Sequence, residues 1–499
     1  MRFEVSKICP GFQFCFDLAR TWLKTCSELH LRCTQATGGT LPTRLLELTC
    51  ENVRLRLSSE LSESEPKYAT LSYCWGDQGN MRTTMNSLSV LRQDITPSAL
   101  PQVILDAIFV TWELGLRYLW MDSLCIIQDS PEDWKVECQR MADYYGNSYV
   151  TISVLDSPDV NRGFLQVKRH KVESPMSNNR GKCLRLAPPE GSEVFKNSAL
   201  NLRAWALQER LLATRVLHYA DSELFWECHT CRAREGSARS NSYPYGDHLK
   251  LLLSNRYRHG VSEGDTFFEV WYRIIKHYSQ RSLSFLSDKL PAISGVAAML
   301  QEKSGFHYIS GLWEEDVFGL TWLRAGPWEE SPRVLPDVRS GLDRTQSIHF
   351  IEGSPTWSWA HVDAPVDYLR HYTRDVTTHN DLEIMQAESP AEGLLTVKAL
   401  FKRLWVKKNE SRFSSTECSH WNKFPYDASD NDGKLAMRRC RTLQSKAKWK
   451  GKTYRCMLPV TPVVGEEGEM VNLLQFSAAT AAFVSREAVK GTTPGLEIP

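Results

Sequence analysis

The chain has 499 residues, enough for about three domains of ordinary size, which excludes a single small core. Its 60 Lys and Arg residues balance 59 Asp and Glu residues, and a net charge of +1 excludes an overall basic surface that captures nucleic acid. With 42% hydrophobic and 24% charged residues, most of the chain is expected to fold rather than remain disordered.

The first apolar stretch is too short for a signal peptide, because Lys7, Pro10 and Asp17 interrupt it. No later stretch approaches the roughly 18 uncharged apolar residues that a membrane span needs. We therefore expect a cytoplasmic protein that binds neither membranes nor nucleic acid. In a reducing compartment its 14 cysteines are expected to be mostly buried thiols.

The N-terminal segment carries Leu23, Cys26 and His30 at helical spacing, which predicts a short amphipathic helix. Together with Cys33 these residues suggest half of a metal site, but the spacing fits no common four-ligand signature. A second pair, Cys228 and Cys231, forms a lone CxxC. Taken separately, neither group predicts a metal, so we expect none.

The alternation of patterns between residues 66 and 228 predicts an α/β fold of the flavodoxin type, with a parallel sheet of four or five strands. Apolar runs predict the strands and periodic segments predict the helices, in the order strand 68–76, helix 101–114, strand 118–122, helix 131–146 and strand 149–155. The helix that starts at Pro131 has Ser130 as its N-cap and an expected apolar stripe of Trp134, Cys138, Met141 and Tyr145.

The rest of the chain is expected to be organised around this sheet. Two strands (44–48 and 53–57) precede it, an insertion with little regular structure (157–200) and a helix (203–212) follow it, then a hairpin (216–227), helices between 265 and 300, and a strand-rich tail from 355–360 and 394–400 onward. The predicted domains are 1–65, 66–228, 229–345 and 346–499. Residues 418–452 have no clear pattern.

Ligands of parallel sheets bind at the carboxyl ends of the strands. Here those ends are residues 74–77, 122–125 and 156–158, which we expect to form one rim. Asp122 ends an apolar strand, where a carboxylate without a partner costs about 1–3 kcal/mol. It is therefore expected either to cap a nearby amide or to bind ribose hydroxyls.

Four blocks of this sequence resemble the signature of the fungal heterokaryon-incompatibility (HET) domain family. They are Tyr68-Ala-Thr-Leu-Ser-Tyr-Cys-Trp-Gly76, Leu119-Trp-Met-Asp-Ser-Leu-Cys-Ile-Ile-Gln128, Asp133-Trp134 with Glu137, Met141 and Tyr145, and Arg203-Ala-Trp-Ala-Leu-Gln-Glu209. Weaker resemblance continues to about residue 400. The resemblance implies a cytosolic fungal protein of allorecognition, in which contact with non-self triggers programmed death of the fused cell.

The family is also distantly similar to TIR domains, whose enzymatic members cleave NAD with a glutamate in a Trp-x-x-x-Glu pattern. Trp205 and Glu209 have that spacing, which implies Glu209 as catalytic residue and Trp205, Trp75, Asp122 and Asp77 as substrate-binding residues. NAD is then a substrate, and no cofactor is expected.

Two alternatives stay open at this point. Trp205 could instead be a core residue, with Glu209 paired to Arg203 or Arg210 on the helix surface. The chain is then a non-catalytic module that assembles with itself or recruits a partner, rather than an NAD glycohydrolase. In either case its partners are expected to be other copies of the HET domain or a sensor protein on another chain. No GxxxxGK[ST] or GxGxxG pattern occurs, which argues against a P-loop enzyme or an ordinary dehydrogenase.

Overall fold

The computed structural model describes the chain over most of its first 368 residues and in separate strands beyond them. The described ranges are 12–33, 39–49, 52–63, 66–77, 79–165, 191–235, 249–250, 253, 267–316, 319–320, 322–324, 351, 354–355 and 357–368, with the backbone of the strands between 382 and 498. The chain divides into two compact units. The first contains residues 1–265, 281–284 and 291–299, and the second contains the remainder.

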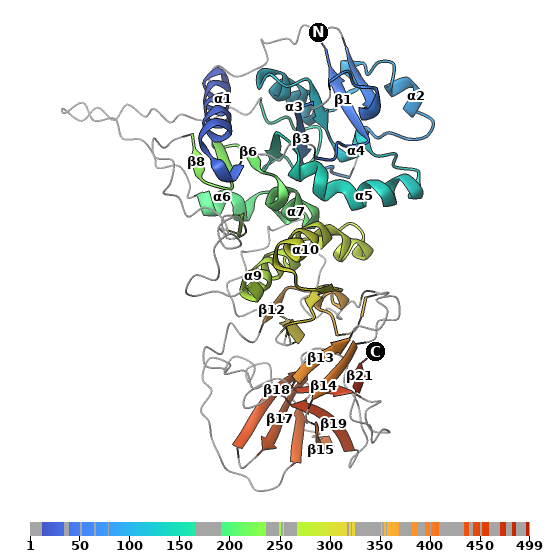
Figure 1. Ribbon diagram of the computed structural model, residues 1–499, viewed down its shortest axis with the longest axis vertical. Coiled ribbons are helices and arrows are strands. Elements are labelled where there is room, and N and C mark those ends of the chain that lie inside the picture. The colour runs from blue at the N-terminus through green and yellow to red at the C-terminus, as the bar shows by residue number, and fades with distance from the viewer. Residues whose placement is uncertain are drawn as a thin grey trace, which may run out of the picture. The chain divides into compact units, whose positions relative to one another are not determined.

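The first unit is built on an eight-stranded sheet in the order β2-β1-β4-β3-β5-β6-β7-β8 (Figure 1). Its strands are β1 (Arg44–Leu48), β2 (Val53–Leu57), β3 (Tyr68–Ser72), β4 (Tyr118–Trp120), β5 (Val150–Val154), β6 (Arg215–Tyr219), β7 (Leu224–Cys228) and β8 (Arg232–Arg234). The four central strands are parallel, and Leu71 pairs with Ile152 as Ala69 pairs with Leu119. This confirms the predicted α/β fold. The sheet exceeds the predicted four or five strands because antiparallel strands extend both edges.

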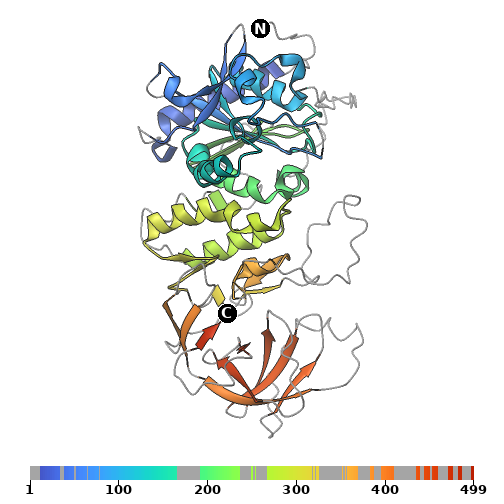
Figure 2. The ribbon, with the colours of Figure 1, turned by 90° about the vertical axis from the view of Figure 1, so that its right-hand side faces the viewer.

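Helices cover both faces of this sheet (Figure 2). The helices of the first unit are α1 (Phe12–Leu29), α2 (Leu88–Leu91), α3 (Gln102–Glu113), α4 (Asp122–Cys125), α5 (Pro131–Gly146), α6 (Gly191–Asn197), α7 (Ala204–Leu212) and the first part of α10 (Pro291–Ser304), which packs against α5 and α7. Because α3 leads from β3 to β4 and α5 leads back past β3 to β5, right-handed crossovers place them on opposite faces. Helix α1 lies beside α3, where the Phe16 and Phe109 ring centroids are 5.6 Å apart.

Helix α5 begins as predicted and buries Met141 and Tyr145 of the expected stripe, but not Trp134. The Ser130 hydroxyl accepts the Asp133 N–H at 3.2 Å, which is the expected N-cap. Trp134, however, is 40% exposed, while Glu137 is buried. The Glu137 carboxylate accepts hydrogen bonds from the Thr43 hydroxyl at 2.6 Å and the Tyr144 hydroxyl at 3.1 Å. These partners come from other elements or lie outside the predicted stripe, so apolar spacing alone did not reveal them.

Two other local predictions need correction. Strand β4 ends at Trp120, and Asp122 opens the short helix α4 rather than ending the strand. The Ser123 backbone N–H donates to Asp122 Oδ1 at 2.8 Å, which favours this early turn. In the predicted insertion, Gly191–Asn197 forms α6. Residues 166–190 of that insertion lie outside the described residues.

The turn after β3 depends on Gly76, which has a φ of +71°. A Cβ on Gly76 would lie 2.4 Å from Asp159 Cβ, whereas a Cβ on Gly115, at φ +78°, meets nothing within 4 Å. Gly115→Ala should therefore cost about 1–2 kcal/mol of backbone strain, and Gly76→Ala about 1–3 kcal/mol more from the clash. Chemical denaturation of the two variants checks this. Equal destabilisation of the two variants would show that Asp159 moves away from the added Cβ at little cost in free energy.

The second unit contains helix α9 (Phe267–Ser279) and many strands. Its short strands are β9 (Tyr308–Ile309), β10 (Leu312–Trp313), β11 (Trp322–Arg324) and β12 (Val366–Tyr368). One three-stranded sheet contains β13 (Leu382–Gln386), β14 (Leu395–Ala399) and β21 (Leu496–Ile498). A six-stranded sheet contains β15 (Phe401–Lys408), β16 (Lys434–Arg438), β17 (Leu443–Trp449), β18 (Lys452–Leu458), β19 (Met470–Gln475) and β20 (Ala482–Ser485). The predicted helices near 265–300 and the strand-rich tail are confirmed, although Trp359–His361 is a 3-10 helix. Within the described part of the chain, no helix is long and apolar enough to cross a membrane.

Candidate active site

Glu209 lies in the second turn of α7, against the carboxyl end of β3. Its side chain is only 3% exposed, and the Ser72 hydroxyl at the end of β3 donates to Glu209 Oε2. The neighbouring Arg210 does not pair with it, since its guanidinium binds the Glu227 carboxylate at 2.7 Å. The structure therefore differs from the surface ion pair considered as an alternative, and the helix turns this carboxyl into the protein.

The surroundings of Glu209 change its acidity. Burial raises the pKa of Glu209 from its ordinary 4.5 to about 7, and the nearby Asp122 charge adds to the rise. The positive charge of Arg203 and the hydrogen bonds from Ser72 and Tyr145 oppose it. Near neutral pH this carboxyl is therefore divided between its protonated and ionised forms, which suits both proton transfer and charge stabilisation.

Arg203 connects the two carboxyl groups. It is the N-cap residue of α7, and its guanidinium donates to the Tyr73 carbonyl oxygen. Burial lowers the pKa of the Arg203 guanidinium, but the negative charges of Glu209 and Asp122 outweigh that effect and raise it overall. Because one cation stands close to both carboxyl groups, they can be near each other without both being neutralised by protons.

Asp122 and Trp75 join the ends of β4 and β3. The Trp75 indole N–H lies 3.1 and 3.0 Å from the two Asp122 carboxylate oxygens, and the Ser123 N–H donates to one of them. Burial raises the pKa of Asp122, with Arg203 opposing the rise. The Asp122 carboxylate thus accepts hydrogen bonds from neutral N–H donors, as the alternative in which it caps a nearby amide expected. The exposed Arg82 guanidinium lies 5.3 Å from the centre of the Trp75 ring.

The third loop of the predicted rim also reaches this place. Asp159, just after the 156–158 segment, lies against Gly76 and contributes to the electrostatic environment of Cys74. The three strand ends named from the sequence therefore lie together. Burial raises the pKa of the Cys74 thiol to about 11. At neutral pH that thiol is protonated, which does not favour it as a nucleophile.

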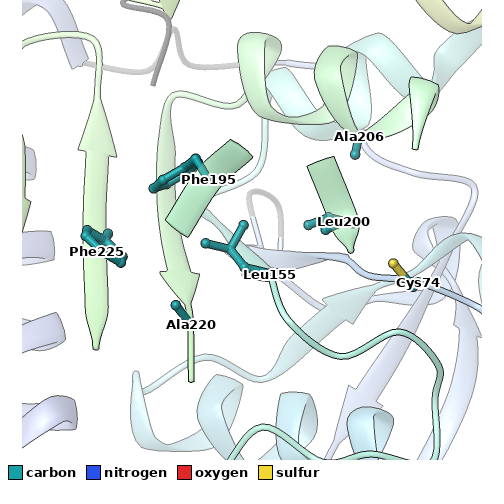
Figure 3. Packing of buried hydrophobic residues seen from close by; sticks show 7 residues of the cluster. All are labelled: Cys74, Leu155, Phe195, Leu200, Ala206, Ala220 and Phe225. Carbon is teal, nitrogen blue, oxygen red and sulfur yellow. The ribbon is translucent and has the colours of Figure 1, made fainter. Parts of the chain in front are cut away.

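An apolar cluster beneath the rim holds α7 in place (Figure 3). It contains Cys74, Leu155, Phe195, Leu200, Ala206, Ala220 and Phe225. The Phe195 ring of α6 packs against the Phe225 ring of β7 with centroids 5.5 Å apart. Because these residues come from α6, α7, the 3-10 helix Leu200–Leu202 before α7 and four strands or their ends, the cluster fixes the first turns of α7 over the sheet. That placement in turn fixes Arg203 and Glu209.

Two residues predicted for substrate binding lie at the surface of this region. Trp205 is half-buried on α7, one turn before Glu209, and Asp77 is exposed in the turn after Trp75. Sequence reasoning missed Ser72 and Tyr145 and treated Arg203 only as a surface partner. Ser72 and Arg203 lie within the blocks 68–76 and 203–209 quoted above, yet nothing local shows that these blocks meet.

The raised pKa of Glu209 predicts a specific dependence of stability on pH. Its folded pKa of about 7 exceeds the ordinary 4.5, so the folded state binds the proton more tightly. The contribution of this residue to stability is present below pH 4.5 and is lost as pH rises through about 7, a change of about 3 kcal/mol. Glu209→Gln should remove this loss.

Unfolding of wild type and Glu209→Gln by denaturant at pH 5 and pH 8 tests the expectation. The variant should gain relative stability between the two values. An identical pH dependence in both proteins would mean that Glu209 is already ionised at pH 5.

Comparison with known proteins identifies one family. Residues 68–209 match the family model described as heterokaryon incompatibility protein (HET). No curated protein and no solved structure matches the chain. The matched segment begins with the first residue of β3 and ends at Glu209, so it contains Ser72, Trp75, Asp122, Arg203 and Glu209. The resemblance read from the four sequence blocks is thereby confirmed.

Proposed function

The chain carries a HET domain, which supports a role in heterokaryon incompatibility, and from this premise we propose that it cleaves NAD at the nicotinamide–ribose bond. In this proposal, loss of NAD in the cytoplasm kills the fused cell. The observation that carries it is the buried Glu209 carboxyl, with a pKa of about 7, beside Arg203 at the carboxyl ends of the parallel strands.

The chemistry requires a group that stabilises positive charge. Breaking the N-glycosidic bond develops an oxocarbenium-like cation on the ribose, and a fixed carboxylate stabilises it more strongly in a buried site than in water. Glu209 supplies that charge in its ionised form. Asp122 offers carboxylate oxygens to ribose hydroxyls, and the indole faces of Trp75 and Trp205 are suited to nicotinamide or adenine.

Because Glu209 is buried, substrate must first gain access to its carboxylate. Since Glu209 is 3% exposed and bound by Ser72, substrate binding must open these contacts before the carboxylate reaches the ribose. We propose that self-association of the HET domain, or a sensor protein on another chain, favours the open form. Activity should then be low in the isolated chain and should increase when copies are brought together.

The test measures NAD cleavage directly. The purified full chain is incubated with NAD, alone and after fusion to an inducible dimeriser, and the released nicotinamide is separated and quantified. The same protein is expressed in fungal cells, where viability and NAD are followed together. Nicotinamide release that accompanies death supports the proposal. Death with unchanged NAD, and no nicotinamide from either form, would overturn it and leave the recruitment module.

A further inference from the structure

A group of metal-ligating side chains lies outside the site around Glu209. It contains Cys26 and His30 from the end of α1, Cys33 from the short 3-10 helix Leu31–Cys33, and Cys228 from the end of β7. One ligand atom of each residue lies within 4.8 Å of the ligand atoms of the others. From the sequence we expected no metal, since each half was incomplete. The fold brings the two halves together across almost 200 residues of sequence.

The distances within this group fit a tetrahedral ion. For zinc, bonds of about 2.3 Å to sulfur and 2.0 Å to nitrogen place two sulfurs about 3.8 Å apart and a sulfur and a nitrogen about 3.5 Å apart. Cys228 Sγ lies 3.5 Å from His30 Nδ1, and the ligand atoms of all four residues lie within 4.8 Å of one another. Thiols that are only packed in an apolar core have no reason to gather with an imidazole around one point, as these four ligand atoms do.

The surroundings are suited to bound thiolates. In the CxxC turn, the backbone N–H groups of Thr230 and Cys231 both point at Cys228 Sγ, at 3.4 and 3.3 Å. The Arg215 guanidinium donates to Cys26 Sγ at 3.3 Å and to the Cys33 carbonyl at 2.7 Å. Donors directed at sulfur stabilise its anionic form and orient it, as the outer partners of metal ligands do.

The charges also balance. A zinc ion with three thiolates and one imidazole keeps one net negative charge, and such a charge is costly in a buried place unless a cation offsets it. Cys26, Cys33 and Cys228 are fully buried, and Arg215, which is 2% exposed, provides the positive charge at hydrogen-bonding distance.

We propose that Cys26, His30, Cys33 and Cys228 bind one structural zinc ion, which fastens the end of α1 to the β7–β8 turn. Soft thiolates with an imidazole in a tetrahedral arrangement select zinc over hard cations such as Mg²⁺ or Ca²⁺. Four protein ligands leave no open position for substrate, so the ion serves folding rather than catalysis. Cys231, whose Sγ lies 3.8 Å from Cys228 Sγ, borders the set and is not one of the four.

The first measurement is the zinc content of the purified full chain, by mass spectrometry of the metal. We expect about one zinc per chain, and Cys228→Ser and His30→Ala should each reduce it at least tenfold. Two control variants should keep the metal. Cys231→Ser alters the same turn, and Cys125→Ser replaces a buried thiol in α4, away from the group. Equal zinc in wild type and Cys228→Ser, or loss in Cys231→Ser, would overturn this ligand set.

A second measurement does not depend on the variants folding. The wild-type chain with Co²⁺ in place of zinc should show the intense visible absorption of tetrahedral cobalt thiolates, and zinc should abolish it. Chelation should lower the unfolding temperature of the wild type, and added zinc should restore it. Absence of the cobalt spectrum, or a Cys228–Cys231 disulfide in peptide maps of chain isolated under thiol-blocking conditions, would overturn the proposal.

Discussion

Glu209→Gln is expected to reduce NAD cleavage at least about 100-fold without preventing folding. The amide keeps the volume of the side chain and can still accept the hydrogen bond from Ser72. It lacks the negative charge that stabilises the ribosyl cation, an interaction of about 3–4 kcal/mol in comparable sites. Because the loss lies in the transition state, kcat should fall more than KM rises.

A matched control separates this effect from the loss of any buried charge. Glu137→Gln removes an equally buried carboxylate from α5, one that contacts Thr43 and Tyr144. It should leave NAD cleavage within a few-fold of wild type when the two proteins are compared at equal folded concentration. Nicotinamide release and cell killing should both disappear in Glu209→Gln. A Glu209→Gln protein that retains half of the wild-type rate would exclude Glu209 as the catalytic residue.

The dependence of the rate on pH provides an independent check. If the ionised carboxylate is the active form, kcat/KM should rise with pH and level off above a pKa of about 7. A rate that falls over the same range would instead assign the protonated form of Glu209 to the reaction.

Glu227→Gln is expected to cause the largest loss of stability in the first unit. The Glu227 carboxylate is fully buried and binds two guanidinium groups, Arg210 at 2.7 and 3.1 Å and Arg232 at 3.0 and 2.7 Å. These cations hold the pKa of Glu227 well below its usual range despite burial. Glu227→Gln removes the negative charge that these two buried arginines share, and breaking a buried ion pair costs about 3–5 kcal/mol.

Equilibrium unfolding of the full chain, followed by tryptophan fluorescence, measures this loss. The control is Glu60→Gln, which breaks an exposed pair with Arg92 and should change stability by less than about 1 kcal/mol. If Glu227→Gln unfolds at the same denaturant concentration as Glu60→Gln, another anion or water must replace the lost charge.

The secondary structure of the sheet domain could be predicted because its signals are local. Ser130 and Pro131 specify the start of α5, and the positive φ of Gly115 specifies the end of α3, from neighbouring residues alone. The alternation of strands and helices then restricts the topology, since parallel crossovers are right-handed. The parallel direction of β4, β3 and β5 follows from this alternation, and so does the rim at their carboxyl ends.

The candidate site could be predicted only in part. Glu209, Trp75 and Asp122 were named as site residues from the sequence, whereas Arg203 was considered only as an alternative surface partner of Glu209 and Ser72 was not considered. The hydrogen bond from Ser72 to Glu209 joins residues 137 positions apart, and no local pattern encodes it. Glu137 was named in its block, but its burial was not predicted, because its partners include Thr43 of a distant segment.

The sequence by itself therefore determined the α/β class, the HET-type blocks and the strand ends that meet at the rim, since each depends on near neighbours or on a general rule of handedness. Only the tertiary structure decided which charges are buried together. The pKa of Glu209 depends on its burial and on Arg203 and Asp122 at once. Cys26 of α1 and Cys33 just after it meet Cys228 only because α1 packs beside β7. Burial and convergence are properties of contacts between distant segments, and those contacts exist only once the sheet has formed.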